Sequence, residues 1–455
     1  MELTAECLAE LSTRGPRYTS YPPATELRPI DDAAVIAELA RLGRDRTPVS
    51  LYAHIPFCRS LCAYCGCNVI PSRDTSRGVG YVETLTTELA LLADALGGQG
   101  HPVCEIALGG GSPNFLEPVS MRRLVTAIER YFSVEPDARR SVELDPRNTA
   151  SSQIETLASL GFRSMSVGVQ DFSQAVQNAI RRHQSVAQTR SLFERARAFG
   201  FDDLNVDIVY GLPHQNEETF ATTLDAVTSL SPDRIALFGY AHLPDKLPHQ
   251  RLVERNGRVL DRFERATLLL FAIEHLMKAG YLYLGLDHFA RADSALARAS
   301  AERRMARTFQ GYFEHRSDTV LGVGTSAIST TPRMFWQSPA TLAPWEEAIA
   351  AQRLPVARGL ALGADDQIRR TVIERLMCDG EVDLTDVGRR HDIDAPSYFA
   401  KEIAELDSLH DLAHYDADST TVKTTNIGRL LVRNVCMAFD RYHQGSSEGR
   451  FSSTI

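Results

Sequence analysis

The chain has 455 residues, of which 44% are hydrophobic, and its 49 lysines and arginines against 58 aspartates and glutamates give a formal net charge of −9. A mildly acidic chain with both signs of charge spread along it lacks the cationic footprint of a nucleic-acid-binding protein, so no nucleic-acid partner is expected. The longest apolar run, residues 268–273, is far shorter than the roughly 20 residues that a membrane-spanning helix needs.

The first residues, MELTAECLAELSTRG, contain no apolar run of the kind found in a signal peptide, so we expect a cytoplasmic protein with no membrane contact. Residues 1–48 are predicted to form an N-terminal arm with a proline-rich stretch and a helix over residues 31–42. The length favours one large barrel, predicted over residues 49–335, followed by a smaller domain over residues 336–455.

From residue 50 onward, short strand patterns alternate with helical patterns. The strands are predicted at residues 50–54, 105–108, 141–144, 164–169, 203–209 and 234–238, with helices at 81–96, 119–132, 151–160, 173–181, 187–199 and 217–230. This alternation indicates successive βαβ crossovers on a parallel sheet. A helix over 261–279 and possible strands at 281–286 and 319–324 follow, and the last of these could close or cap the sheet.

In such folds the chemistry lies at the carboxyl ends of the strands. The unusual residues of this chain follow that rule, because they lie directly after, or at the end of, the six predicted strands: Cys58, the glycines 109–111, Glu143, Asp145, Gln170, Asp207, Ala241 and His242. We therefore expect them at one rim.

The C-terminal region has a different pattern. A helix starting near Asp365 and ending before Gly380, helices at 384–391 and 396–408, a hairpin around 411–424 and a helix at 428–442 predict a small helical domain with a wing. Such a shape can bind DNA or serve only for packing, and the absence of a basic stripe favours packing.

Four of the eight cysteines lie within ten residues, at Cys58, Cys62, Cys65 and Cys67, while the other four are scattered and expected to be buried thiols. Thiolates at spacings of four and three residues suit an iron–sulfur cluster. Three ligands leave the fourth iron of a cube open to an external molecule. Structural zinc is an alternative in which Cys67 supplies the fourth sulfur, although four ligands from one short stretch make a poor tetrahedron.

Other segments carry a resemblance. The Cys-x3-Cys-x2-Cys motif with Tyr64 before its last cysteine is similar to that of the radical S-adenosylmethionine (SAM) superfamily, and GGGSP at 109–113 resembles its SAM-binding glycine stretch. More narrowly, the chain resembles the oxygen-independent coproporphyrinogen III oxidases through motifs that include GPRYTSYP (15–22), LYAHIPFC (51–58), CGC (65–67), ELDPR (143–147), GVQDF (168–172), NVDIVYGLP (205–213), YAHLP (240–244), DHFAR (287–291), FQGY (309–312) and GRLLVRNVCMAFD (428–440).

The resemblance implies a partial (β/α)6 barrel of the α/β class with an N-terminal arm and a mostly helical C-terminal domain. It also implies an enzyme of haem biosynthesis in which a [4Fe–4S] cluster and SAM generate a 5′-deoxyadenosyl radical. That radical converts two propionates of coproporphyrinogen III to vinyl groups. The product is protoporphyrinogen IX.

Site residues follow from the same resemblance. Cys58, Cys62 and Cys65 would hold the cluster. The glycine stretch, Gly110 and Gly111 with Ser112, together with Tyr52, Glu143 and Ile328, would surround the cluster-bound SAM. A second SAM molecule would contact Tyr64, Gln170, Arg182, Asp207 and Ala241. Tyr52, Glu143, Phe309 and Gln310 would serve catalysis, and Cys67 matches a family cysteine whose role the spacing does not define.

Each of these positions also has an ordinary structural interpretation. A triple glycine can be a loose turn, Glu143 a solvated carboxylate, Arg182 part of a solvated helix face, and a Phe-Gln pair core and cap. Because the substrate carries four carboxylates, its cleft needs cations, and Arg17 and Arg291 are the candidates. The arm is expected to cover the barrel mouth and exclude water. We expect a monomer that needs an unidentified reducing electron donor and a terminal electron acceptor.

Two rival functions share parts of this pattern. A haem chaperone of the same superfamily would bind and insert haem, but the resemblance implies that such chaperones lack the second cysteine of CGC and the YTSYP arm, both of which this chain has. A radical SAM methyltransferase acting on tetrapyrroles is the third possibility, and the nearly end-to-end resemblance argues against it.

Overall fold

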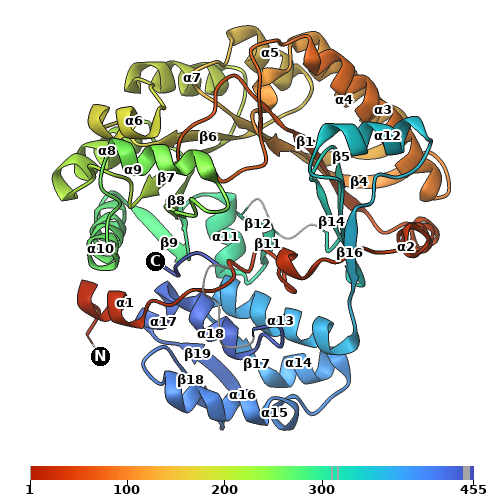
Figure 1. Ribbon diagram of the computed structural model, residues 1–455. Helices are drawn as coiled ribbons and strands as arrows, with labels where there is room; N and C mark the ends of the chain where they lie inside the picture. The colour runs from red at the N-terminus through yellow and green to blue at the C-terminus, as the bar shows by residue number, and fades with distance from the viewer. Residues whose placement is uncertain (1, 309–310, 315–316, 444–450) are drawn as a thin grey trace.

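The computed structural model describes residues 2–308, 311–314, 317–443 and 451–455. Six parallel strands form its centre and lie side by side in chain order: β1 (Val49–Ile55), β4 (His101–Gly110), β5 (Phe132–Leu144), β6 (Ser164–Gln170), β7 (Asp203–Tyr210) and β8 (Arg234–Gly239). These confirm the six predicted strands. Figure 1 shows the sheet curving around the middle of the molecule.

Helices cover the convex side of this curve (Figure 1). They are α3 (Arg77–Ala95), α4 (Pro118–Tyr131), α5 (Ser151–Ser159), α6 (Gln174–Ile180), α7 (Val186–Ala198), α8 (Glu217–Ser229) and α10 (Arg262–Lys278). Their starts are fixed locally: the side chain of Ser185 caps α7 by accepting from the backbone N–H of Gln188, and Asp261 caps α10 in the same way. The strands beneath them are buried on both faces, as a parallel sheet between two layers requires.

The sheet extends beyond the six strands at both ends. On the β1 side, β13 (Val320–Val323) is parallel to β1, and β14 (Ile328–Thr330), β15 (Met334–Gln337) and β16 (Arg358–Ala361) follow antiparallel. On the β8 side lie β10 (His288–Arg291) and β9 (Tyr281–Gly285). The segment over residues 319–324 therefore widens one edge, and the end strands β16 and β9 do not pair with each other in the described part of the chain. The predicted boundary between residues 335 and 336 falls inside β15.

The C-terminal part is mostly helical, with a small wing. α13 (Ala364–Asp379) ends at Gly380 and is followed by β17 (Glu381–Asp383), α14 (Leu384–His391), α15 (Ala395–Tyr398), α16 (Ala400–Glu405), β18 (Ala413–Asp416), β19 (Thr421–Thr424), α17 (Asn426–Leu430) and α18 (Val432–Ala438). The predicted single helices over 396–408 and 428–442 are each wrong in length, because the chain bends out of helical geometry near Phe399 and Leu431.

Segments from outside the parallel sheet fill its concave side. The hairpin of β11 (Met305–Thr308) and β12 (Gly311–Glu314) packs against α11 (Ala295–Ala301) and α13. No helix in the described ranges is both long and apolar enough to cross a membrane.

The N-terminal arm runs across this side of the molecule, between α1 (Ala5–Leu11) and α2 (Asp32–Asp45). Buried Arg433 of α18 holds it in place by donating to the carbonyls of Gly15, Pro16 and Ser453. Tyr18 adds a hydrogen bond of 3.0 Å to Asp440. Both ends of the chain are therefore tied to the C-terminal helices.

Candidate active site

The cysteine loop leaves the end of β1 and is closed at its base by a short parallel pair, β2 (Phe57–Cys58) and β3 (Ile70–Pro71). Backbone contacts hold the loop against the neighbouring rim. The N–H of Ala63 donates to the carbonyl of Ile180 over 2.9 Å, and Nε2 of His249 donates to the carbonyl of Cys65 over 2.8 Å. The position of the loop is thus set by residues that follow other strands.

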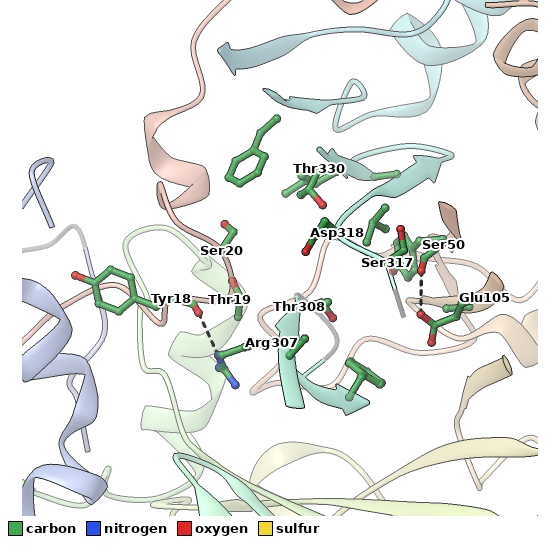
Figure 2. A pocket seen from close by; sticks show the side chains of 18 of the residues that line it. Tyr18, Thr19, Ser20, Ser50, Glu105, Arg307, Thr308, Ser317, Asp318 and Thr330 are labelled. Carbon is green, nitrogen blue, oxygen red and sulfur yellow. Dashed lines mark hydrogen bonds between the residues drawn. The ribbon is translucent and has the colours of Figure 1, made fainter. Parts of the chain in front are cut away.

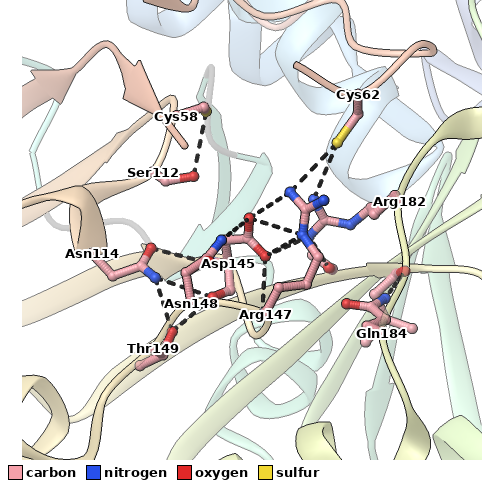
Figure 3. Close-up of polar contacts among 12 residues, drawn as sticks. Cys58, Cys62, Ser112, Asn114, Asp145, Arg147, Asn148, Thr149, Arg182 and Gln184 are labelled. Atoms are coloured by element: carbon pink, nitrogen blue, oxygen red, sulfur yellow. Dashed lines mark hydrogen bonds and ion pairs between the residues drawn. The ribbon is translucent and has the colours of Figure 1, made fainter. Parts of the chain in front are cut away.

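The sulfurs lie among polar and cationic groups (Figure 3). Cys58 Sγ lies 3.4 Å from Ser112 Oγ. Cys62 Sγ lies 3.5 Å from a guanidinium nitrogen of Arg182 and 3.6 Å from one of Arg147. Positive charge near sulfur stabilises the thiolate, which is the form that ligates metal.

Cys65 and Cys67 interact directly. A hydrogen bond with Cys67 outweighs burial and lowers the pKa of Cys65 to about 6. Cys67 itself is exposed and lines a cavity on the concave side of the sheet. The four scattered cysteines, Cys7, Cys104, Cys378 and Cys436, are buried, which confirms their prediction.

The arrangement of the cysteines fits an iron–sulfur cube. In the described residues no three His, Cys, Asp or Glu side chains converge closely enough for a single metal ion. A cube places each cysteine on a different iron, so its ligands stand farther apart than those of one ion. Three neighbouring thiols on one loop, with guanidiniums beside Cys62, can supply three of the four ligands of such a cube.

The glycine stretch at the end of β4 approaches its neighbours so closely that side chains are excluded. A Cβ on Gly110, whose φ is +111°, would lie 2.5 Å from the ring of His54, and one on Gly111 would lie 2.6 Å from the carbonyl oxygen of Pro56. The loose-turn interpretation is therefore wrong. Close backbone approach leaves room for a ligand beside the stretch, while the N–H of Gly111 itself donates to the carbonyl of Ile55 over 2.8 Å.

Glu143 lies at the end of β5 beside this stretch. Its Oε2 accepts a hydrogen bond of 3.0 Å from the N–H of Gly110. Burial raises the pKa of Glu143 to about 7, so it is not the solvated carboxylate considered above. Tyr52 lies on the same wall, with its hydroxyl 3.1 Å from Nδ1 of His54, and burial lowers the pKa of His54 to about 4.

A cavity of about 560 Å³ occupies the concave side of the sheet. Its wall includes Tyr52, Gly110, Glu143 and Ile328, so the sheet brings these four positions together. Residues 18–21 of the arm also line it, as expected for a segment that covers the barrel, together with residues of β11, β12 and α13. Figure 2 shows Tyr18, Thr19 and Ser20 along one side of this group and Ser50 and Glu105 along another.

The residues predicted for a second SAM molecule gather at the neighbouring part of the rim. Gly168, two residues before Gln170, pairs in register with Asp207, and Gln250 donates to the carbonyls of both Tyr64 and Ala241. Burial raises the pKa of Asp207 to about 6. None of these five predicted residues is among those that line the cavity in the described chain.

Arg182 is buried, and its guanidinium interacts with groups of the protein. It pairs with Asp145 at 3.3 Å and contacts Cys62 and the carbonyl of Gly168 (Figure 3). Arg147 pairs with the other oxygen of Asp145 at 2.6 Å. Burial would raise the pKa of Asp145, but the two guanidiniums hold it below its ordinary value. The solvated-face interpretation of Arg182 is wrong. Arg147, for which the sequence predicts no role, also lies beside the cysteine loop.

The two arginines predicted to bind substrate carboxylates do not line the cavity. Arg17 forms an ion pair with Asp287, and Arg291 pairs with Asp293 at 3.0 Å on the surface. That prediction finds no support, because both guanidiniums already have carboxylate partners. Phe309 and Gln310 lie outside the described residues.

Comparisons with known proteins agree with this geometry. Residues 52–227 match the radical SAM superfamily. The oxygen-independent coproporphyrinogen III oxidase of Pseudomonas aeruginosa is 36% identical, with 99% of this chain and 98% of that protein covered, and that of Escherichia coli K12 is 37% identical, with 97% and 96% covered. The solved structure of coproporphyrinogen III oxidase from Escherichia coli, described as a radical SAM enzyme, superposes with a TM-score of 0.89 at 36% identity, covering 94% of this chain and 98% of that one.

Full-length likeness to these enzymes, together with the three-cysteine loop beside the glycine stretch, places the chain in a defined group. It belongs to the oxygen-independent coproporphyrinogen III oxidase family within the radical SAM superfamily.

Proposed function

We propose that the chain catalyses the oxygen-independent oxidative decarboxylation of two propionates of coproporphyrinogen III, which yields protoporphyrinogen IX in haem biosynthesis. The observation that carries the proposal is the position of Glu143 and Gly110 beside the cysteine loop and on the wall of the 560 Å³ cavity. A cavity of this size is in the range that holds a small organic ligand.

Cys58, Cys62 and Cys65 would hold the [4Fe–4S] cluster, and the glycine stretch with Glu143 would hold SAM. When bound, the two cofactors supply a carbon radical that removes a hydrogen atom from the β carbon of a propionate, after which loss of carbon dioxide and one electron leaves the vinyl group. The other functions in the reaction are those of the protein's own residues.

These residues bind and orient the ligands and exclude water from the cavity. The N–H of Gly110 fixes the carboxylate of Glu143, which then faces the cavity as an acceptor for a ligand cation. Arg147 and Arg182 contact the sulfur of Cys62 and so help to fix the position of that side chain. The arm, held by Arg433, covers the cavity and keeps water from a reactive radical.

Several finer features belong to the same proposal. A second SAM molecule would bind at Tyr64, Gln170, Arg182, Asp207 and Ala241, where the engaged guanidinium of Arg182 would orient the site through Asp145. An external donor supplies electrons, and an acceptor takes up the last electron of each decarboxylation. We propose that the enzyme acts as a monomer in the cytoplasm.

One anaerobic assay tests the proposal. The reconstituted protein receives reductant, SAM and coproporphyrinogen III, and chromatography follows tetrapyrroles while carbon dioxide is trapped. We expect two molecules of carbon dioxide for each protoporphyrinogen IX. Stoichiometric haem binding without decarboxylation would instead favour the haem-chaperone alternative.

A further inference from the structure

The cavity has two arginines that no carboxylate neutralises. Arg307 of β11 and Arg370 of α13 both line it. Neither has an ion-pair partner in the described part of the chain. His54 also lines the cavity, but its lowered pKa keeps it neutral. These two guanidiniums therefore carry the positive charge of the described cavity wall.

Each guanidinium is held in place by contacts that leave its charge uncompensated. Nε of Arg307 donates to the carbonyl of Tyr18 over 3.1 Å, and its guanidinium lies 4.8 Å from the ring centre of Tyr312. Arg370 donates to the carbonyl of Thr331 over 3.1 Å and lies 5.4 Å from the ring centre of Phe335. A guanidinium has five N–H donors, so most of them remain for a ligand.

One of these donors has no partner at all. Nη1 of Arg307 is buried and forms no hydrogen bond with any described residue. A buried donor without an acceptor costs free energy, so its persistence needs an explanation. Because Nη1 is buried even while the cavity is empty, a small rotation of the guanidinium would be needed to bring it to an anionic group that enters the cavity beside Arg307.

Other half-buried arginines nearby are neutralised, which sets this pair apart. Arg139 and Arg234 both pair with Asp203 at 2.7 Å. Five acidic residues share the described cavity wall: Glu314 pairs with Arg304 at 2.7 Å and Glu374 with Arg375 at 3.9 Å, Glu105 and Glu143 accept hydrogen bonds from Ser50 and Gly110, and Asp318 is the fifth. Figure 2 places Arg307 against the backbone of the arm, apart from Glu105 on the other side of the group.

The two arginines also come from a different part of the fold than the cofactor residues. Tyr52, Gly110 and Glu143 belong to the parallel sheet, whereas β11 and α13 fill its concave side. Along the edge of the sheet, Ile328 pairs with Gln337, and two residues further Thr330 pairs with Phe335, the ring that supports Arg370. The cavity thus has a cofactor wall and a separate cationic wall.

We propose that Arg307 and Arg370 bind the carboxylates of the propionates that are not reacting, and so present a reacting propionate to the cofactor wall. The inference rests on the proposed function and adds to it the subsite for the substrate carboxylates. A planar guanidinium can hold a carboxylate through two parallel hydrogen bonds, which fixes the direction as well as the position of a propionate. Two such anchors fix the position of two propionates, and with them the orientation of the macrocycle that carries them.

The test measures binding, independently of turnover. Arg307→Gln, Arg370→Gln and the control Arg291→Gln, whose arginine is paired with Asp293 away from the cavity, are titrated with coproporphyrin III, the fluorescent six-electron oxidation product of coproporphyrinogen III that keeps all four propionates. We expect each cavity variant to weaken binding at least about tenfold, the control to leave it unchanged, and Arg370→Lys to restore part of the loss.

Two further probes separate carboxylate recognition from packing. Coproporphyrin III tetramethyl ester in detergent has no free carboxylate, so it should bind the variants and the parent protein equally. Mesoporphyrin IX keeps only the two propionates that the reaction leaves intact, so the variants should weaken its binding as much as that of coproporphyrin III. SAM binding should not change in any variant.

The outcomes are distinguishable from failure of the proposed function. Equal binding of coproporphyrin III by the glutamine variants and the parent protein would overturn the inference, and so would an equal loss of ester binding. A parent protein that binds coproporphyrin III through these arginines yet releases no carbon dioxide in the anaerobic assay would refute the activity and leave the carboxylate subsite standing.

Discussion

The carboxylate of Glu143 accepts a hydrogen bond of 3.0 Å from the backbone N–H of Gly110, which joins the ends of two neighbouring strands, β5 and β4, at the wall of the cavity. A side chain on Gly110 would collide with His54, so this contact depends on glycine at that position. Through this hydrogen bond, the fold holds the carboxylate of Glu143 at the cavity wall, where it can bind a cationic ligand.

The pKa of Glu143 predicts a pH dependence of SAM binding. Because burial raises this pKa to about 7, the carboxylate gains its charge as pH rises from 6 to 8. We expect the affinity of the reconstituted protein for SAM, measured by anaerobic equilibrium dialysis, to rise about tenfold over that range. Glu143→Gln keeps an acceptor for Gly110 but has no charge, so its affinity should be weaker and independent of pH. A variant with the parent pH profile would assign the titration to another group.

The structure of the cysteine loop predicts that alanine substitutions of Cys62 and Cys104 have different effects on the cluster. Cys62→Ala removes a sulfur that lies beside Arg147 and Arg182, and should abolish the iron–sulfur absorption and the turnover together. Cys104→Ala, at a buried position of β4, should keep both, with only a modest loss of stability. Full activity of Cys62→Ala would refute the cluster assignment.

Glu88 predicts a pH dependence of stability. It is buried on α3 and accepts hydrogen bonds from the N–H of Gly324 at 2.8 Å and from Nε1 of Trp345 at 2.9 Å, and burial raises its pKa to about 8. The folded state therefore retains a proton that the unfolded state releases above an ordinary value of 4.5. The free energy of unfolding should fall by about 2 kcal/mol between pH 6 and pH 8.

Glu88→Gln tests this directly, because its amide oxygen can still accept both hydrogen bonds. Calorimetry should show that its melting temperature falls less than that of the parent protein between pH 6 and pH 8. Glu83→Gln, at an exposed position of the same helix, is the matched control and should follow the parent. The same steep fall in Glu88→Gln would contradict the assignment.

The hydrogen bonds of Arg433 predict that this side chain holds the N-terminal arm in place. Arg433→Met leaves the carbonyls of Gly15, Pro16 and Ser453 without their donor, so stability should drop by about 3 kcal/mol. Amide hydrogen exchange should accelerate around residues 11–22, while the cluster absorption stays unchanged. Arg390→Met, at an exposed position of α14, should change neither measurement. An arm that stays protected in Arg433→Met would mean that other contacts hold it.

The sequence allowed the parallel sheet and its reactive rim to be predicted because local signals coincide there. Mostly apolar strands such as β1 and β7 alternate with capped helices, and residues such as Glu143 lie in the last positions of their strands. The edge strands β14–β16 and the hairpin β11–β12 are antiparallel and short, so they carry no comparable alternation of strand and helix.

Which arginines reach the cavity could not be predicted in the same way. Arg17 and Arg291 stand in distinctive motifs, yet their partners Asp287 and Asp293 take up their charge. Arg307 and Arg370 reach the cavity only because the hairpin and α13 pack into the concave side of the sheet. That packing depends on contacts between segments far apart in the chain, which periodicity does not reveal.

We propose that three cysteines hold a cube whose remaining iron binds SAM. Electron paramagnetic resonance of the anaerobically reconstituted, reduced protein is the decisive measurement. We expect a [4Fe–4S] signal in the parent protein that changes its g values when SAM is added, and the loss of that signal in Cys62→Ala. A reduced cluster whose spectrum stays the same at saturating SAM, or a purified protein that carries zinc in place of iron, would refute this assignment.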